Sequence, residues 1–139
     1  MESIYIKEKL YKKILDSFSF ENEDGGILGG TNEEITEFYF LKGDKKDIYD
    51  IDTQKFSEVC DEWDKKDISF LGFIHSHLGC TARVSVTDFN YVYRFMKSND
   101  WLEKLLFFIL IKKENGEKEI LPFVYVNNDF ILYKLVIIK

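Results

Sequence analysis

Hydrophobic positions in the first part of the chain change from a strand-like run to a helical period. Residues 4–6 form a short apolar run that predicts a strand, and residues 8–18 have the spacing of an amphipathic helix. The apolar side of this predicted helix carries Leu10, Ile14, Leu15 and Phe18. We therefore expect the helix to pack against a sheet.

The middle of the chain predicts a hairpin, two further helices and a buried strand. The turn-like sequence Thr31-Asn32-Glu33-Glu34 separates two apolar runs, and Asp52 or Thr53 is a suitable first residue for the next helix. A short apolar run then follows with the character of a buried strand. These predicted elements cover residues 26–30 and 35–41 for the hairpin, 53–63 for the second helix, 68–74 for the strand and 86–96 for the third helix.

Three apolar runs after residue 100 predict further strands, over residues 105–111, 118–126 and 130–138. Asn115-Gly116 and Asn127-Asn128 are the turn signals between them. Their nearly continuous Phe, Ile, Leu and Val content predicts central strands covered on both faces. The expected fold class is α/β or mixed α+β, with helices packed on a mixed sheet. The aromatic residues of this region either fill the core or form a partner surface, and they include Tyr125, Phe130 and Tyr133.

Composition limits the domain organisation and the partners. The chain has 139 residues, 45% of them hydrophobic, which suits one compact domain over residues 1–139. Its net charge of −6 disfavours nucleic acid as a partner and favours a basic protein tail. The N-terminus has no secretory apolar region and no run approaches the roughly 20 residues of a membrane span, so we expect a cytoplasmic protein.

Candidate chemistry lies directly after the predicted strand 68–74. The two histidines of the chain stand there as His75-Ser76-His77, followed by Ser85 and Asp88. Alternating strand geometry predicts that His75 and His77 point to one side, whereas Ser76 faces away. Ser85 is a suitable helix N-cap with Asp88 in the first turn, and a loop that folds back would bring this carboxylate to both imidazoles. Three such ligands leave one position of a tetrahedral zinc open, as in catalytic zinc sites.

Zinc-dependent hydrolysis also requires a carboxylate that accepts a proton from water. Glu21, Glu23 and Asp24 precede a glycine-rich apolar stretch whose glycines would allow another backbone or a substrate to approach closely. The alternative for this cluster is a solvated acidic turn. Taken alone, Ser85 and Asp88 could be a capping arrangement, and the two histidines could be core residues. Cys80 is either a ligand, a redox-sensitive group or, more commonly for a lone cysteine, a small apolar filler.

Two sequence elements together resemble one enzyme family. They are Glu23-x-Gly25-Gly26-Ile27-Leu28-x-Gly30 and His75-x-His77-x7-Ser85-x2-Asp88. This pattern is similar to the JAMM (MPN+) zinc metallopeptidases, in a short single-domain form like the prokaryotic JAB proteins. Leu78 and Val84 stand where members often have proline. The resemblance implies a JAB/MPN-like, cytidine-deaminase-like mixed sheet with helices packed on it.

The resemblance also implies roles and partners. His75, His77 and Asp88 would bind one Zn²⁺ per chain, Glu23 would be the general acid/base, and Ser85 would stabilise the tetrahedral intermediate. The substrate would be the amide or isopeptide bond after the C-terminal glycine of a ubiquitin-like or sulfur-carrier protein, with conjugating enzymes as possible further partners. A noncatalytic MPN-type scaffold module and a RadC-like JAB protein are the alternative interpretations.

Overall fold

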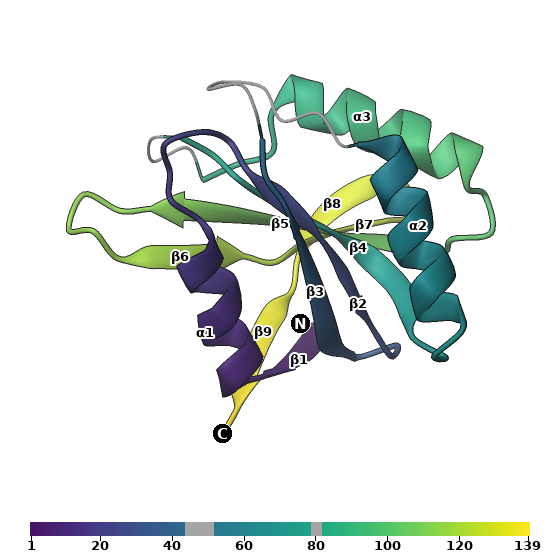
Figure 1. Ribbon diagram of the computed structural model, residues 1–139. Coiled ribbons are helices and arrows are strands. Elements are labelled where there is room, and N and C mark those ends of the chain that lie inside the picture. Colours follow the sequence, from purple (N-terminus) through teal and green to yellow (C-terminus); the bar gives the residue numbers. More distant parts are fainter. Residues whose placement is uncertain (44–51, 79–81) are drawn as a thin grey trace.

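The computed structural model describes residues 1–43, 52–78 and 82–139 (Figure 1). Within these residues the helices are α1 Glu8–Ser17, α2 Thr53–Asp64 and α3 Val86–Ser98. The strands are β1 Ser3–Lys7, β2 Gly25–Gly30, β3 Glu34–Leu41, β4 Ser69–Ser76, β5 Lys104–Lys112, β6 Lys118–Leu121, β7 Phe123–Val126, β8 Asp129–Leu132 and β9 Lys134–Ile138.

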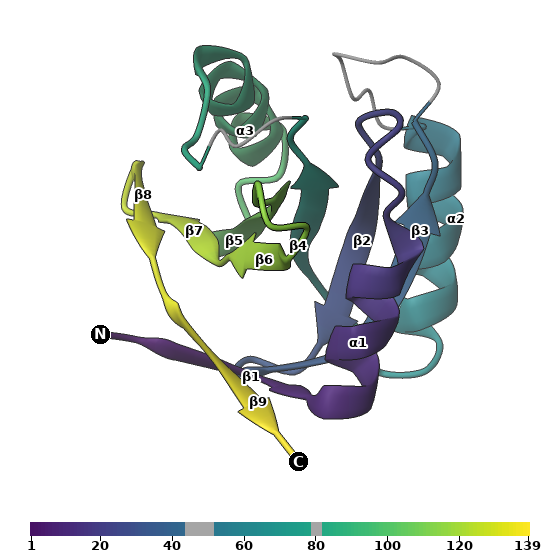
Figure 2. The same cartoon turned by 90° about the vertical axis from the view of Figure 1, so that its left-hand side faces the viewer.

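All strands of the described residues belong to one strongly curled sheet. Its strand order is β8-β7-β5-β4-β2-β3-β1-β9, and β6 pairs with β5 outside this path. The pairs β1–β3, β1–β9 and β4–β5 are parallel, whereas the remaining pairs are antiparallel. The edge strands β8 and β9 are separated in sequence only by Tyr133. The sheet therefore curls until its two edges meet at this residue, which leaves a nearly closed barrel (Figure 2).

The predicted fold class is wrong. We expected an α/β or α+β, JAB/MPN-like layered sheet with helices packed on it, but the chain is mostly β, with 41% strand and 27% helix around a barrel-like sheet. The reason lies in the last third of the chain. Pro122 cannot donate a ladder hydrogen bond and divides the expected strand 118–126 into β6 and β7. Tyr133 likewise divides residues 130–138 into β8 and β9, and these short strands bend the sheet back towards β1.

Two hydrophobic clusters lie on opposite faces of the sheet because neighbouring strand residues point to opposite sides. Helix α1 contributes Ile14 and Phe18 to one cluster, together with the β4 residue Ile74. Helices α2 and α3 contribute Trp63 and Val92 to the other. The remaining buried members of the α1 cluster are Ile4, Ile6, Leu28, Ile35, Phe38, Leu106, Phe108, Leu110, Ile120, Val124 and Tyr133. Those of the α2/α3 cluster are Ile27, Val59, Phe73, Leu105, Phe107 and Tyr125.

Two glycines allow close approaches that fix this packing. A Cβ atom on Gly29 would lie 2.6 Å from the Trp63 ring, so the glycine lets α2 pack directly on β2. Gly72 has a φ of +157° and lies against the backbone of Leu106 on β5. The glycines of β2 were predicted to admit a backbone or a substrate. Gly30 lies against the backbone of Glu34, as predicted, whereas Gly29 admits a core side chain.

The positions of the individual elements agree well with the hydrophobic pattern. The predicted helices, the hairpin and the turns at residues 115–116 and 127–128 are present, and Asp52 caps α2 by accepting a hydrogen bond from the Lys55 amide. Tyr125 and Tyr133 are buried and Phe130 is partly buried, which confirms core packing for these aromatic residues. The expectation of fully covered strands holds for β5 but is wrong for β8 and β9. Among the helices of the described residues, none has the length and apolar character needed to span a membrane.

Candidate metal centre

The histidine pair lies at the end of β4, next to the centre of the sheet. His75 is the penultimate residue of β4, and the His77 amide donates to the Leu110 carbonyl at 3.0 Å, which continues the pairing with β5 beyond the last strand residue. Both side chains face the α2/α3 side, where the His75 ring lies 4.8 Å from the Phe107 ring between centroids. The predicted common orientation of the two imidazoles is therefore confirmed.

Asp88 reaches the histidines from the first turn of α3. Ser85 is the N-cap of this helix, and its hydroxyl accepts a hydrogen bond from the Asp88 amide at 3.1 Å. In return the Asp88 Oδ2 accepts from the Ser85 amide at 3.0 Å, which completes a capping box. This local motif fixes the orientation of the carboxylate before any contact with the histidines is made.

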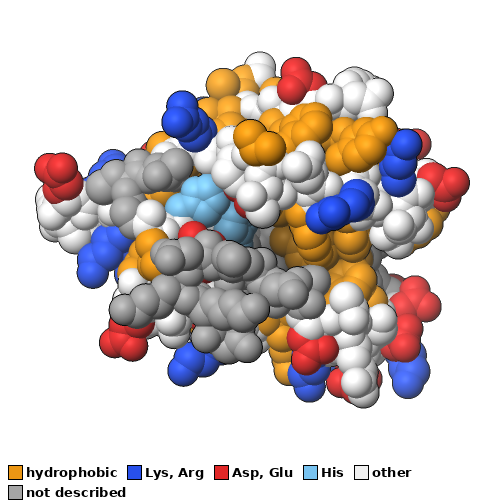
Figure 3. All heavy atoms as spheres, turned by 90° about the horizontal axis from the view of Figure 1, so that it is seen from above, with side chains coloured by type: hydrophobic (Ala, Val, Ile, Leu, Met, Phe, Trp, Pro, Cys, Tyr) orange, Lys and Arg blue, Asp and Glu red, His pale blue; other side chains and the backbone are white. Residues whose placement is uncertain are grey.

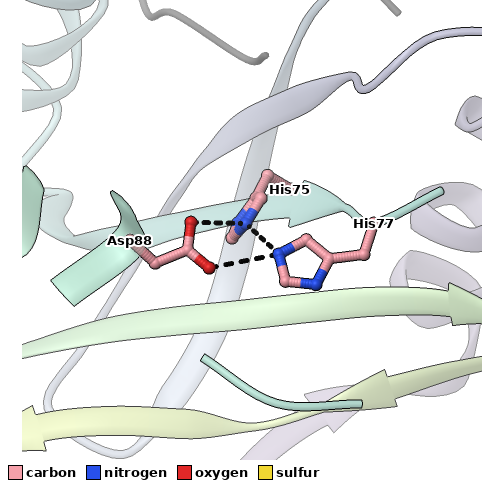
Figure 4. A group of neighbouring side chains, drawn as sticks. All are labelled: His75, His77 and Asp88. Atoms are coloured by element: carbon pink, nitrogen blue, oxygen red, sulfur yellow. Dashed lines mark hydrogen bonds and ion pairs between the residues drawn. The ribbon is translucent and has the colours of Figure 1, made fainter. Parts of the chain in front are cut away.

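The three side chains converge through their terminal atoms (Figure 4). The two Nε2 atoms are 2.9 Å apart, the His77 Nε2 lies 3.1 Å from Asp88 Oδ2, and the His75 Nε2 lies 3.2 Å from Asp88 Oδ1. The side chains of His75, His77 and Asp88 are 7%, 9% and 14% exposed. This group of two nitrogens and one carboxylate could hold a metal ion.

The donor chemistry and the spacing both fit a cation at the centre of the group. Two imidazole nitrogens that face each other repel unless a proton or a metal ion lies between their lone pairs. A tetrahedral zinc with Zn–N distances of about 2.0–2.1 Å has edges of about 3.3–3.4 Å between its ligand atoms. The observed Nε2–Nε2 edge of 2.9 Å is slightly shorter, and each imidazole contacts a different oxygen of Asp88, so a shared ion would require small movements of the three side chains.

The electrostatics of Asp88 keep its carboxyl group ionised. Burial opposes ionisation, but hydrogen bonds with His75 and His77, the electrostatic interaction with His75, and the hydrogen bond from the Ser85 amide outweigh it. Together these interactions hold the pKa of the Asp88 carboxyl well below its usual range. Asp88 is therefore available as an anionic ligand at neutral pH.

The structure places Glu23 beside the same group. Burial raises the pKa of the Glu23 carboxyl, while electrostatic interactions with His75 and His77 and a hydrogen bond from the Leu78 amide act in the opposite direction. The negative charge of Asp88 adds to the increase in pKa. Glu23 is half-buried in the loop before β2 and does not belong to the three converging ligands. A carboxylate with a raised pKa next to a metal site is suited to accept and return a proton.

The neighbouring carboxylates and serines have other positions. Glu21 is exposed, and Asp24 is buried with its Oδ1 accepting from the Gly43 amide at 2.7 Å. Ser85 caps α3 as described, which leaves its hydroxyl proton available for a further acceptor. Ser76 faces away from the histidines, as predicted, but its contact with Asp24 was not predicted from the sequence. Cys80 lies outside the described residues.

The candidate metal-binding group is visible from one side of the molecule. Histidine atoms are visible there, and hydrophobic side chains lie on the same face (Figure 3). On α3, directly after the capping serine, Val86, Phe89 and Tyr93 are 78%, 40% and 43% exposed. Their spacing of three and four residues places them along one side of the helix. An apolar stripe therefore begins next to the candidate metal ligands.

Comparison with known proteins supports the fold but no activity. No family model and no curated protein matches the chain. The chain is similar to the solution structure of protein DSY2949 from Desulfitobacterium hafniense, a structural genomics target, with a TM-score of 0.78 and 18% sequence identity over 98% of this chain and 93% of that chain. At this level of identity the likeness establishes a shared fold over nearly the whole length of both chains.

Proposed function

We propose that this protein is a zinc-dependent peptidase or isopeptidase of the JAMM type. The observation that carries the proposal is the convergence of His75, His77 and Asp88 within hydrogen-bond distance of one another, with the Glu23 carboxylate beside them. Two imidazoles and one carboxylate are a common ligand set for catalytic zinc, which retains an open position for water or substrate. The order and spacing of these residues also match the family pattern.

The metal and the side chains have separate tasks in this proposal. A zinc ion held by His75, His77 and Asp88 would supply Lewis acidity, which polarises a carbonyl group and lowers the pKa of water to about 7. Glu23 takes the proton from the attacking water and later returns it to the leaving amine. The Ser85 hydroxyl, whose proton is not used in the helix cap, donates to the oxygen of the tetrahedral intermediate.

The proposed substrate is the bond after the C-terminal glycine of a ubiquitin-like or sulfur-carrier protein. The resemblance in the residues around Glu23 and His75 supports this class. The apolar stripe of Val86, Phe89 and Tyr93 supports a folded protein as substrate, because it provides a surface next to the metal ligands. The net charge of −6 favours a partner with a basic tail over nucleic acid.

The decisive experiment measures bound zinc and hydrolysis in the same preparations. Purified wild-type protein and the Glu23→Gln variant are compared for zinc per chain and for cleavage of ubiquitin-like proteins with a fluorescent amide after the terminal glycine. We expect about one zinc in both proteins and turnover only in the wild type. Glu23→Gln is a suitable change because it keeps the size of the side chain and an acceptor for the Leu78 amide.

Two other results would redirect the interpretation. Full activity of Glu23→Gln would remove Glu23 from the mechanism. A wild-type protein that neither retains nor rebinds zinc would contradict the enzyme proposal and favour a noncatalytic MPN-type module. Binding of duplex DNA at moderate salt, measured with the same protein, would favour the RadC-like alternative.

A further inference from the structure

We infer that Ser76 is a positioning residue that holds the Glu23 segment beside the metal ligands. The inference rests on the proposed function, because the position of Glu23 matters for catalysis only if Glu23 transfers the proton. The sequence places Ser76 between two candidate ligands, where strand alternation turns its side chain to the opposite face of the sheet. It therefore cannot bind the same ion, and its hydroxyl group requires another explanation.

The Ser76 contacts described here all lead to one residue, Asp24. Ser76 is fully buried, and its hydroxyl accepts from the Asp24 amide at 3.0 Å. The same hydroxyl lies 3.4 Å from the Asp24 carbonyl oxygen, and the Ser76 amide donates to this oxygen at 2.8 Å. Because Gly25 pairs with His75, these contacts extend the β2–β4 ladder one residue beyond the end of β2. The side chain of Ser76 thereby attaches the residue next to Glu23 to the strand that carries the ligands.

The opposite side of the same segment is held by Gly43. Its amide donates to Asp24 Oδ1 at 2.7 Å, and a Cβ atom at this position would collide with the Glu23 carbonyl oxygen. The backbone of Glu23 and Asp24 is therefore enclosed between the end of β3 and the end of β4. Neither contact involves the Glu23 carboxylate, which remains directed to the other residues of the site.

The Glu23 side chain has a second attachment on the ligand strand. Its carboxylate accepts from the Leu78 amide, directly after His77, while Ser76, directly before His77, holds the backbone of the adjacent Asp24. Glu23 is thus attached to the ligand strand on both sides of His77, directly at its side chain and through Asp24 at its backbone. Loss of the Ser76 hydroxyl would remove the acceptor of the Asp24 amide and leave only the bond from the Ser76 amide to the Asp24 carbonyl, without removing any ligand.

The test compares Ser76→Ala with the wild type by three measurements. Amide hydrogen exchange of the metal-free proteins reports the hydrogen bonding of the Asp24 and Leu78 amides directly. We expect Ser76→Ala to accelerate exchange of both amides by at least about tenfold, since each loses or loosens its acceptor. Zinc content should stay at the wild-type value. With a cleavable substrate, kcat should fall by about 10²-fold at unchanged KM, the size expected for a misplacement of about 1 Å.

A matched control distinguishes positioning from general loss of stability. Ile14→Val shortens a buried side chain of α1 in the cluster on the opposite face and should lower Tm without changing kcat or the two amides. If Ser76→Ala does not fold, Ser76→Cys takes its place, because the thiol fills a similar volume and is a weak hydrogen-bonding group. Unchanged exchange at Asp24 and Leu78, or a kcat loss equal to that of Ile14→Val, would overturn the inference.

The two proposals can fail separately. Zinc binding and faster Leu78 exchange in Ser76→Ala, together with a wild-type protein that cleaves no substrate, would uphold the positioning role of Ser76 and reject the peptidase proposal. Activity in the wild type with an unchanged kcat in Ser76→Ala would reject the positioning role and leave the peptidase proposal intact.

Discussion

Removal of Asp88 should abolish stabilisation of the protein by zinc. The carboxylate supplies one of the three converging ligands, at 3.1 and 3.2 Å from the two imidazole nitrogens. A ligand that binds only the folded state at one hundred times its Kd stabilises this state by about 2.7 kcal/mol. For 139 residues at about 2.1 cal/mol/K per residue, the unfolding entropy is about 0.29 kcal/mol/K. Zinc should therefore raise Tm of the wild type by about 9 °C.

The assay follows thermal unfolding by circular dichroism in chelator and at increasing free zinc. Asp88→Ala should show a shift of less than about 2 °C at the zinc concentration that saturates the wild type. The variant also loses half of the capping box, which costs about 1 kcal/mol, or about 3 °C, even without metal. The shift must therefore be measured within each variant, between chelator and zinc.

Ser85→Ala is the matched control for the capping effect. It removes the hydroxyl that accepts from the Asp88 amide but keeps all three candidate ligands, so it should lower Tm in chelator and retain most of the zinc shift. An equal zinc shift in Asp88→Ala and wild type would refute the assignment of Asp88 as a ligand. The absence of any zinc shift in the wild type would refute the metal site itself.

Three further predictions concern backbone packing, pH and substrate binding. Gly72→Ala should lower the free energy of unfolding, measured in urea, by at least about 3 kcal/mol, because its Cβ would collide with the Leu106 backbone. The control Gly116→Ala has open space around its Cβ and should lower this free energy by about 1–2 kcal/mol through its φ of +88° alone. Equal losses in the two variants would contradict the packing argument. Burial raises the pKa of the Glu23 carboxyl, so its neutral form stabilises the fold at pH values below its ordinary pKa, and this contribution is lost as pH rises through the raised pKa. In chelator, the Tm of Glu23→Gln should therefore equal that of the wild type near pH 4 and exceed it at pH 8. A difference in Tm that does not depend on pH would exclude burial of this carboxylate as the cause. In steady-state kinetics, Val86→Glu should raise KM several-fold for a folded ubiquitin-like substrate but leave KM for a short glycine-ended peptide unchanged. Equal effects on both substrates would argue against the apolar stripe as a binding surface.

The local parts of the site could be predicted from the sequence because each rests on a short-range rule. Strand alternation places His75 and His77 on one side, and the spacing of Ser85 and Asp88 defines a capping box. Both motifs involve only residues that are a few positions apart. Their meeting was anticipated from ligand chemistry, because two imidazoles alone do not complete a zinc site. The position of Glu23 was anticipated only through the family resemblance.

The long-range features could not be read from the pattern. The hydrophobic character of residues 118–126 and 130–138 predicts strands, but it does not tell whether each run is one flat strand or two short strands at an angle. Pro122 and Tyr133 decide this, and with it the closure of the sheet. The hydrogen bonds of Ser76 with Asp24 also depend on a pairing between strands that are distant in sequence, and a lone serine in a strand carries no signal of it.

The closure of the sheet has a consequence for the order of folding. Among the strands of the described residues, β9 pairs only with β1, so the final seam joins segments from opposite ends of the described chain. By contrast, β2 and β4, which position the candidate site, pair over a sequence separation of about 40–50 residues, against about 130 residues for β1 and β9. Contacts between distant segments form slowly, because a large loop must close first. We therefore expect pulse-labelled amides of β2 and β4 to become protected before those of β1 and β9 during refolding, so that the metal site would mature in a chain whose barrel is still open.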